Sequence, residues 1–108
     1  MDVELVEIRD FVAEHHPFDL LPEDELAALA RAISVRYLKR DSVLMEPGDR
    51  VEALSIVRSG ALETFTPEGD LLARLDEGEA GGIRALLRGG MAVNRILAIE
   101  DSLLYQIP

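Results

Sequence analysis

Residues 53–65 read ALSIVRSGALETF, and this stretch decides the fold. Two short runs rich in apolar residues flank Ser59 and Gly60, a pair of residue types that favours a tight turn. The pattern predicts two strands joined as a hairpin at Ser59 and Gly60. We therefore expect β structure in the middle of the chain.

Similar signals recur from residue 34 to the end of the sequence. Short runs of strand-forming residues alternate with turn signals, as in SVRYL (34–38), SVLMEPGD (42–49), PEGD (67–70), LLARLDEGE (71–79) and NRILAIEDSLLYQIP (94–108). About seven or eight strands at this spacing are typical of an all-β barrel or sandwich. The sequence predicts a mainly β domain with a helical N-terminus.

Residues 1–33 carry the helical signal. The first helix is expected in DVELVEIRDFVAEHH (2–16), where Leu5, Ile8, Phe11 and Val12 recur at helical spacing. This apolar stripe needs a partner, and either the β domain, a second copy of the chain or a neighbouring domain could supply it. A second helix begins at Pro22, followed by three acidic residues that favour a helix N-terminus. Its apolar stripe is Leu26, Leu29, Ala30 and Ile33.

Composition limits the class of protein. A chain of 108 residues suits a single domain, here divided into helices (1–33) and a β-roll (34–108) with a short helix near 83–88. Its net charge of −10 disfavours contact with nucleic acid or anionic membranes. The absence of cysteine excludes disulfides and thiolate metal sites and fits a cytoplasmic protein. No apolar run is long enough to span a bilayer.

Catalytic and metal-binding residues are scarce. His15 and His16 are adjacent, so on a helix they point about 100° apart and are better explained as an exposed helix end than as a metal site. The acidic clusters at 23–25 and 76–77 are best explained as a helix first turn and a solvated turn. We therefore expect neither an enzyme nor a metal protein.

Residues 81–95, GGIRALLRGGMAVNR, are the best candidate for a functional site. Gly81 and Gly82 allow close approach of a ligand to the backbone, and the short helix that follows could offer free N–H groups to an anion. Alternatively, the glycines form tight turns while Ile83, Leu86 and Leu87 plug the core. The residues alone favour the plug.

At this point the chain resembles the cyclic nucleotide-binding domains. The resemblance rests on Val51, Leu54, the pair Ile56 and Val57, and Gly60, together with turn glycines at 48 and 78. A more local resemblance, carried by HHPFDLLPEDELAALA (15–30) and IEDSLLYQIP (99–108), is to bacterial signal-transduction proteins in which such a domain precedes CBS domains and a nucleotidyltransferase-like module.

The resemblance implies a jelly-roll-like β-roll with a phosphate-binding cassette between two strands. In members that bind cAMP or cGMP, the cassette has a Gly-Glu pair that holds the ribose and an arginine that pairs with the cyclic phosphate. Gly82 matches the glycine, whereas Ile83 and Val93 stand in place of the glutamate and the arginine. Losing both charge-assisted contacts is expected to abolish or alter cAMP and cGMP binding.

A displaced cation could replace the missing arginine. Arg84, Arg88 and Arg95 are the candidates, and Asn94 could offer a polar contact. In a strand that begins near Val93, however, Val93 and Asn94 would point to opposite faces. Rescue by a neighbouring arginine is therefore the less favoured alternative.

The sequence thus predicts a regulatory ligand-sensing domain in a larger signalling chain. We expect no cofactor, and a cyclic nucleotide is the less favoured alternative. The expected pocket consists of Gly81, Gly82, Ile83, Arg84, Ala85, Leu86, Ala92, Val93, Asn94 and Arg95. A sensor of a different, less charged ligand requires this pocket to be open. The alternative is a module for protein–protein interaction or dimerisation through the first helix, in which Ile83 and Val93 would fill the pocket.

Overall fold

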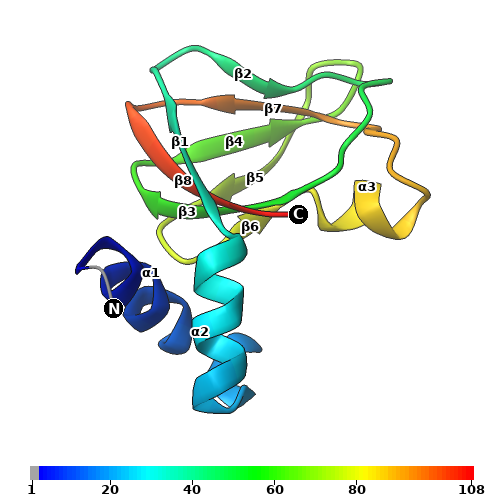
Figure 1. Cartoon of the computed structure of the whole chain (residues 1–108). Coiled ribbons are helices and arrows are strands. Elements are labelled where there is room, and N and C mark those ends of the chain that lie inside the picture. Colours follow the sequence, from blue (N-terminus) through cyan, green and yellow to red (C-terminus); the bar gives the residue numbers. More distant parts are fainter. Residues whose placement is uncertain (1–2) are drawn as a thin grey trace.

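A computed structural model describes residues 3–108, which form two small helices packed against an eight-stranded β-roll (Figure 1). One sheet has the strand order β1-β8-β3-β6 and the other β2-β7-β4-β5. The strands are β1 (Ser34–Leu38), β2 (Val43–Met45), β3 (Leu54–Ser59), β4 (Leu62–Phe65), β5 (Leu71–Leu75), β6 (Ala80–Gly81), β7 (Arg95–Ala98) and β8 (Ser102–Ile107). The predicted mainly β, jelly-roll-like fold with a helical N-terminus is confirmed.

The helices are α1 (Val3–Ala13), the 3-10 turn η1 (Phe18–Leu20), α2 (Glu23–Ala32) and α3 (Ile83–Leu87). Pro22 precedes α2 as its N-cap in extended geometry, and the three carboxylates that follow it occupy the first turn. These positions match the start signal in the sequence, because the helix dipole favours anions there. None of the helices within residues 3–108 is long and apolar enough to cross a bilayer.

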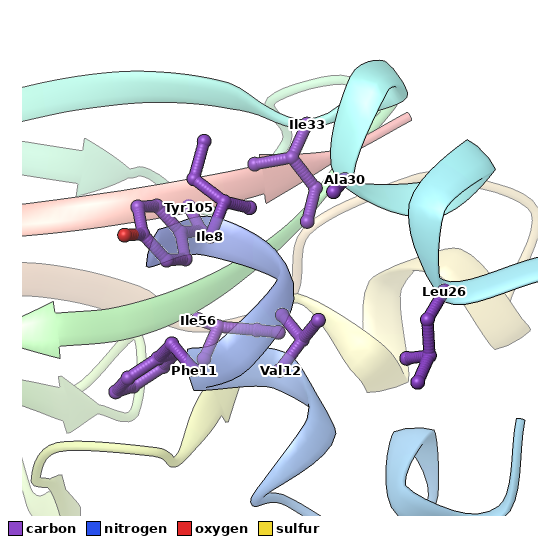
Figure 2. Packing of buried hydrophobic residues seen from close by; sticks show 8 residues of the cluster. All are labelled: Ile8, Phe11, Val12, Leu26, Ala30, Ile33, Ile56 and Tyr105. Atoms are coloured by element: carbon purple, nitrogen blue, oxygen red, sulfur yellow. The ribbon is translucent and has the colours of Figure 1, made fainter. Parts of the chain in front are cut away.

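Two hydrophobic clusters form the core, one between the sheets and one outside them. The inner cluster contains Leu38, Met45, Val57, Leu62, Ala92, Ile96, Ala98 and Leu104, drawn from both sheets. The outer cluster contains Ile8, Phe11, Val12, Leu26, Ala30, Ile33, Ile56 and Tyr105 (Figure 2). The same strands contribute to both clusters, because successive side chains of a strand point to opposite faces of the sheet. Val57 and Leu104 therefore face the inner cluster, and Ile56 and Tyr105 the outer one.

The apolar stripe of α1 packs on the β-roll of its own chain. Phe11 meets Tyr105 of β8 edge to face, with ring centroids 5.5 Å apart. Ile8 and Val12 are buried in the same cluster, which Figure 2 shows between the helices and the sheet. The stripe thus needs no second copy to cover it, and a homodimer through α1 stays an untested prediction.

The expected hairpin at Ser59 and Gly60 is wrong. β3 pairs with β8 and β6, whereas β4 pairs with β5 and β7, so the two strands lie in different sheets. Gly60 has φ +94°, and a Cβ there would lie 2.7 Å from the carbonyl oxygen of Asp101. The turn is therefore a corner between sheets, and it needs glycine for both its backbone angle and its space. The predicted turn at 67–70 is present, and the structure shows that it joins the paired strands β4 and β5.

We predict that Val12→Ala lowers the free energy of unfolding by about 2 kcal/mol, because it removes buried methyl groups and leaves a cavity. Val12 has no exposed surface, whereas Val3, on the same helix, is 74% exposed. Val3→Ala is therefore the matched control and is expected to change stability by less than about 0.5 kcal/mol. Urea unfolding followed by circular dichroism measures both. Equal effects would contradict the packing of α1 on the roll.

Candidate functional site

A cavity of about 690 Å³ opens beside α3, within the size range of small-molecule sites. Its walls come from β4, β5, the segment from β6 into α3, and the residues that precede β7. The lining residues are Met45, Thr64, Thr66, Leu72, Ala73, Leu75, Ala80, Gly81, Gly82, Ile83, Arg84, Ala85, Arg88, Val93, Asn94 and Ile96. Most of this lining is apolar, with hydroxyl, amide and guanidinium groups at a few points.

The cassette, which is the candidate segment 81–95, is attached to the sheet through Gly81 and Gly82. Gly81 pairs with Ser55 of β3, which fixes the strand end, and Gly82 then turns the chain into α3 with φ +97°. A Cβ at Gly82 would lie 3.3 Å from the carbonyl oxygen of Ala53, so the two backbone segments approach closely. The Leu86 N–H donates to the Gly82 carbonyl at 3.0 Å and closes the first turn. The sequence therefore needs glycine here for a close approach and a left-handed backbone.

The structure brings most of the predicted pocket residues together. Gly81, Gly82, Ile83, Arg84, Ala85, Val93 and Asn94 all line the cavity. Leu86, Ala92 and Arg95 do not: Ala92 is buried in the inner cluster, and the Arg95 Nε lies against Glu46 Oε1 in an ion pair. Of the arginines considered as replacement cations, Arg84 and Arg88 are on the cavity and Arg95 is elsewhere.

Ile83 and Val93 stand on the cavity wall without filling it. They are 50% and 45% exposed, and Leu87 is 81% exposed. The alternative that Ile83, Leu86 and Leu87 plug the core is therefore wrong, because their helix lies at the edge of the roll (Figure 1). The expectation that Val93 and Asn94 point to opposite faces also fails. β7 begins only at Arg95, so strand alternation does not apply to them, and both line the cavity.

Sequence reasoning missed the contribution of β4 and β5. Thr64 and Thr66 are two residues apart, so they lie on one face of β4 and its extension, as do Ala73 and Leu75 on β5. Alternation could have grouped each pair. The packing of these strands beside α3 depends on long-range pairing, which no local signal in the sequence indicates.

The lining of the cavity carries positive charge in an acidic chain. Among residues 3–108 it contains two arginines and no aspartate or glutamate. The groups with shifted pKa values are elsewhere. The Arg40 N–H and the Tyr37 hydroxyl donate to Asp101 and hold its pKa below the ordinary value. Desolvation and the hydrogen bond to Asp101 raise the pKa of Tyr37, and the hydrogen bond to Asp76 raises that of Arg74.

The histidines have structural surroundings. The Nδ1 of His15 lies 2.7 Å from the carbonyl oxygen of Phe11, and the two rings are 4.4 Å apart. His15 is thus partly buried against α1, which ends at Ala13, and only His16 matches the expected exposed end. The Nδ1 of His16 contacts Asp19 at 3.0 Å. Among residues 3–108 no group of three or more His, Cys, Asp or Glu side chains could hold a metal ion.

Comparison with known proteins identifies the family. The sequence profile of the cyclic nucleotide-binding domain matches residues 35–108, and the chain belongs to this family. Glutaminase 1 of Bradyrhizobium diazoefficiens is 37% identical over 76 residues, which are 70% of this chain and 12% of that protein. The chain thus matches about an eighth of that relative's length.

Solved structures share the fold over nearly the whole chain. The regulatory domain of Toxoplasma gondii PKA with cAMP superposes with a TM-score of 0.86 at 22% identity, over 99% of this chain and 42% of that one. The regulatory subunit of a cAMP-independent protein kinase A from Trypanosoma cruzi, bound to guanosine, has a TM-score of 0.85 at 18% identity, over 97% and 40%. These structures show that the chain has the fold of the cyclic nucleotide-binding domains, the family that its sequence defines.

We predict that Ile83→Ala lowers the free energy of unfolding by less than about 1 kcal/mol, because Ile83 is half exposed on an open cavity. Ile96 lines the same cavity but is 4% exposed, so Ile96→Ala is expected to cost about 2–5 kcal/mol. Urea unfolding of both variants tests the point. A similar cost at the two positions would mean that Ile83 fills the site.

Proposed function

We propose that the domain is a regulatory ligand sensor whose cavity binds a small molecule. We propose further that it does not bind cAMP or cGMP through the usual cassette glutamate and arginine. The observation that carries the proposal is the open cavity at the cassette, with Ile83 and Val93 on its wall. A regulatory domain that served only as a docking surface would have no need of such an opening.

The exchange of both charged positions for apolar residues supports a changed ligand. A cyclic phosphate at these positions would lose its hydration and gain no charge-assisted hydrogen bond, each worth about 1.5–3 kcal/mol. Because both charges are absent, no uncompensated buried charge remains in the site. The cassette therefore needs no cyclic nucleotide to compensate a buried charge. The guanosine in the Trypanosoma cruzi subunit is a precedent in the same fold for a ligand that is not a cyclic nucleotide.

The domain itself is proposed to have no catalytic activity and to act on other domains of a larger signalling chain. Support comes from the chain's family, and from the small share of longer proteins that it matches. The resemblance of residues 15–30 and 99–108 to signal-transduction proteins suggests CBS and nucleotidyltransferase-like neighbours.

We predict that the double variant Ile83→Glu with Val93→Arg shows a larger rise in Tm with cAMP than the native chain does. Thermal unfolding of the native chain and of the double variant is measured with cAMP, cGMP, adenosine and guanosine. A ligand at 100 times its Kd stabilises by about 2.7 kcal/mol, which shifts Tm by roughly 4–8 °C in a domain of this size. The native chain is expected to show no such shift with cAMP or cGMP, because the charged contacts are missing.

The matched control is Ile83→Leu with Val93→Leu, which keeps the site apolar and is expected to behave as the native chain. A Tm shift of the native chain with cAMP or cGMP would contradict altered recognition and would mean that other residues hold the cyclic phosphate.

A further inference from the structure

We infer that the ligand of this cavity is an organic anion, with an apolar body in the cavity and its negative group held by Arg84 and Arg88. The inference rests on the proposed function, because it names the ligand class for the same cavity. It replaces the expectation of a less charged ligand, and it places the anion on α3 rather than at the positions of the lost cassette charges.

The first observation is the position of the two guanidinium groups. Arg84 lies in α3 and Arg88 directly follows it, with the Arg88 N–H donating to the Arg84 carbonyl at 3.1 Å. Side chains four residues apart on a helical turn are neighbours on one face. Both residues line the cavity and both are exposed. One small anion can therefore contact both guanidinium groups.

The second observation is that neither arginine has a partner within residues 3–108. Most other arginines near the roll are paired: Arg58 contacts Glu77 at 3.2 Å, Arg74 contacts Asp76 at 2.8 Å, and Arg95 contacts Glu46. Two like charges one turn apart repel each other, and an anion bound between them removes that repulsion. The chain is rich in acidic residues, yet none of those within the described range 3–108 lies on the cavity wall.

The remaining lining defines the rest of the ligand. Ile83, Val93, Leu72 and Leu75 offer apolar contact, while Thr64 and Asn94 can exchange hydrogen bonds. Because two guanidinium groups line the cavity among residues 3–108 and no carboxylate of this range does, the charge at its wall favours an anion over a cation. A ligand with an aromatic or aliphatic body and one terminal carboxylate or sulfonate group meets all of these conditions.

The test uses two dyes that share an aromatic body and differ in charge. Fluorescence titration measures the affinity of anionic 8-anilinonaphthalene-1-sulfonate and of neutral N-phenyl-1-naphthylamine. The native chain is expected to bind the sulfonate at least about tenfold more tightly than the amine. Arg84→Gln with Arg88→Gln is expected to weaken the sulfonate at least about tenfold and the amine less than about twofold.

The matched control is Arg31→Gln with Arg36→Gln, which removes the same net charge from α2 and β1, away from the cavity lining. It is expected to change the sulfonate affinity less than about twofold, since distant exposed charges are screened. An equal loss in this control, or equal affinity of the native chain for the two dyes, would overturn the inference.

Val93→Trp and Ile83→Trp show whether the dyes occupy the cavity at all. Each places a large ring on the wall at a half-exposed position, and each is expected to weaken both dyes. If neither variant changes either affinity, or the native chain binds neither dye, the proposed ligand cavity fails and the inference fails with it. If both variants weaken both dyes but the sulfonate is not preferred, only the inference fails.

Discussion

The Ser102 side chain is 1% exposed, and its hydroxyl connects the two places where the chain turns a corner. It accepts the Ala61 N–H at 3.2 Å and donates to the Glu100 carbonyl at 2.9 Å. Gly60 lies against it, where any Cβ would collide. A buried hydroxyl must be hydrogen-bonded, so this contact fixes how β3 and β4 diverge into different sheets. The interior of the roll depends on that divergence.

β3 then serves three parts of the molecule at once. Ile56 packs against the N-terminal helices, Val57 packs between the sheets, and Ser55 pairs with Gly81 at the start of the cassette. The helices and the cassette are thus held by neighbouring residues of a single strand. A displacement of the cassette would therefore act directly on the strand against which α1 is packed.

The segment from Gly81 to Asn94 combines a close backbone contact with an open cavity. Gly82 brings the chain close to Ala53, and the cavity opens beside α3. Ile83 and Val93 form an apolar part of its wall, and the positive charge comes from Arg84 and Arg88. Because both arginines are exposed, the cavity carries this charge without the cost of burying it unpaired.

The sequence by itself determined the mainly β class and the two N-terminal helices, because periodicity and turn residues are local properties. It could not reveal that Gly60 is a corner, that Leu87 is exposed, or that Thr64 and Leu72 line the cavity. These depend on which strands pair across long sequence separations. The same long-range packing separated Arg84 and Arg88 from Arg95, three arginines that are equivalent in the sequence. Only the tertiary structure places two of them on the cavity and gives the third to Glu46.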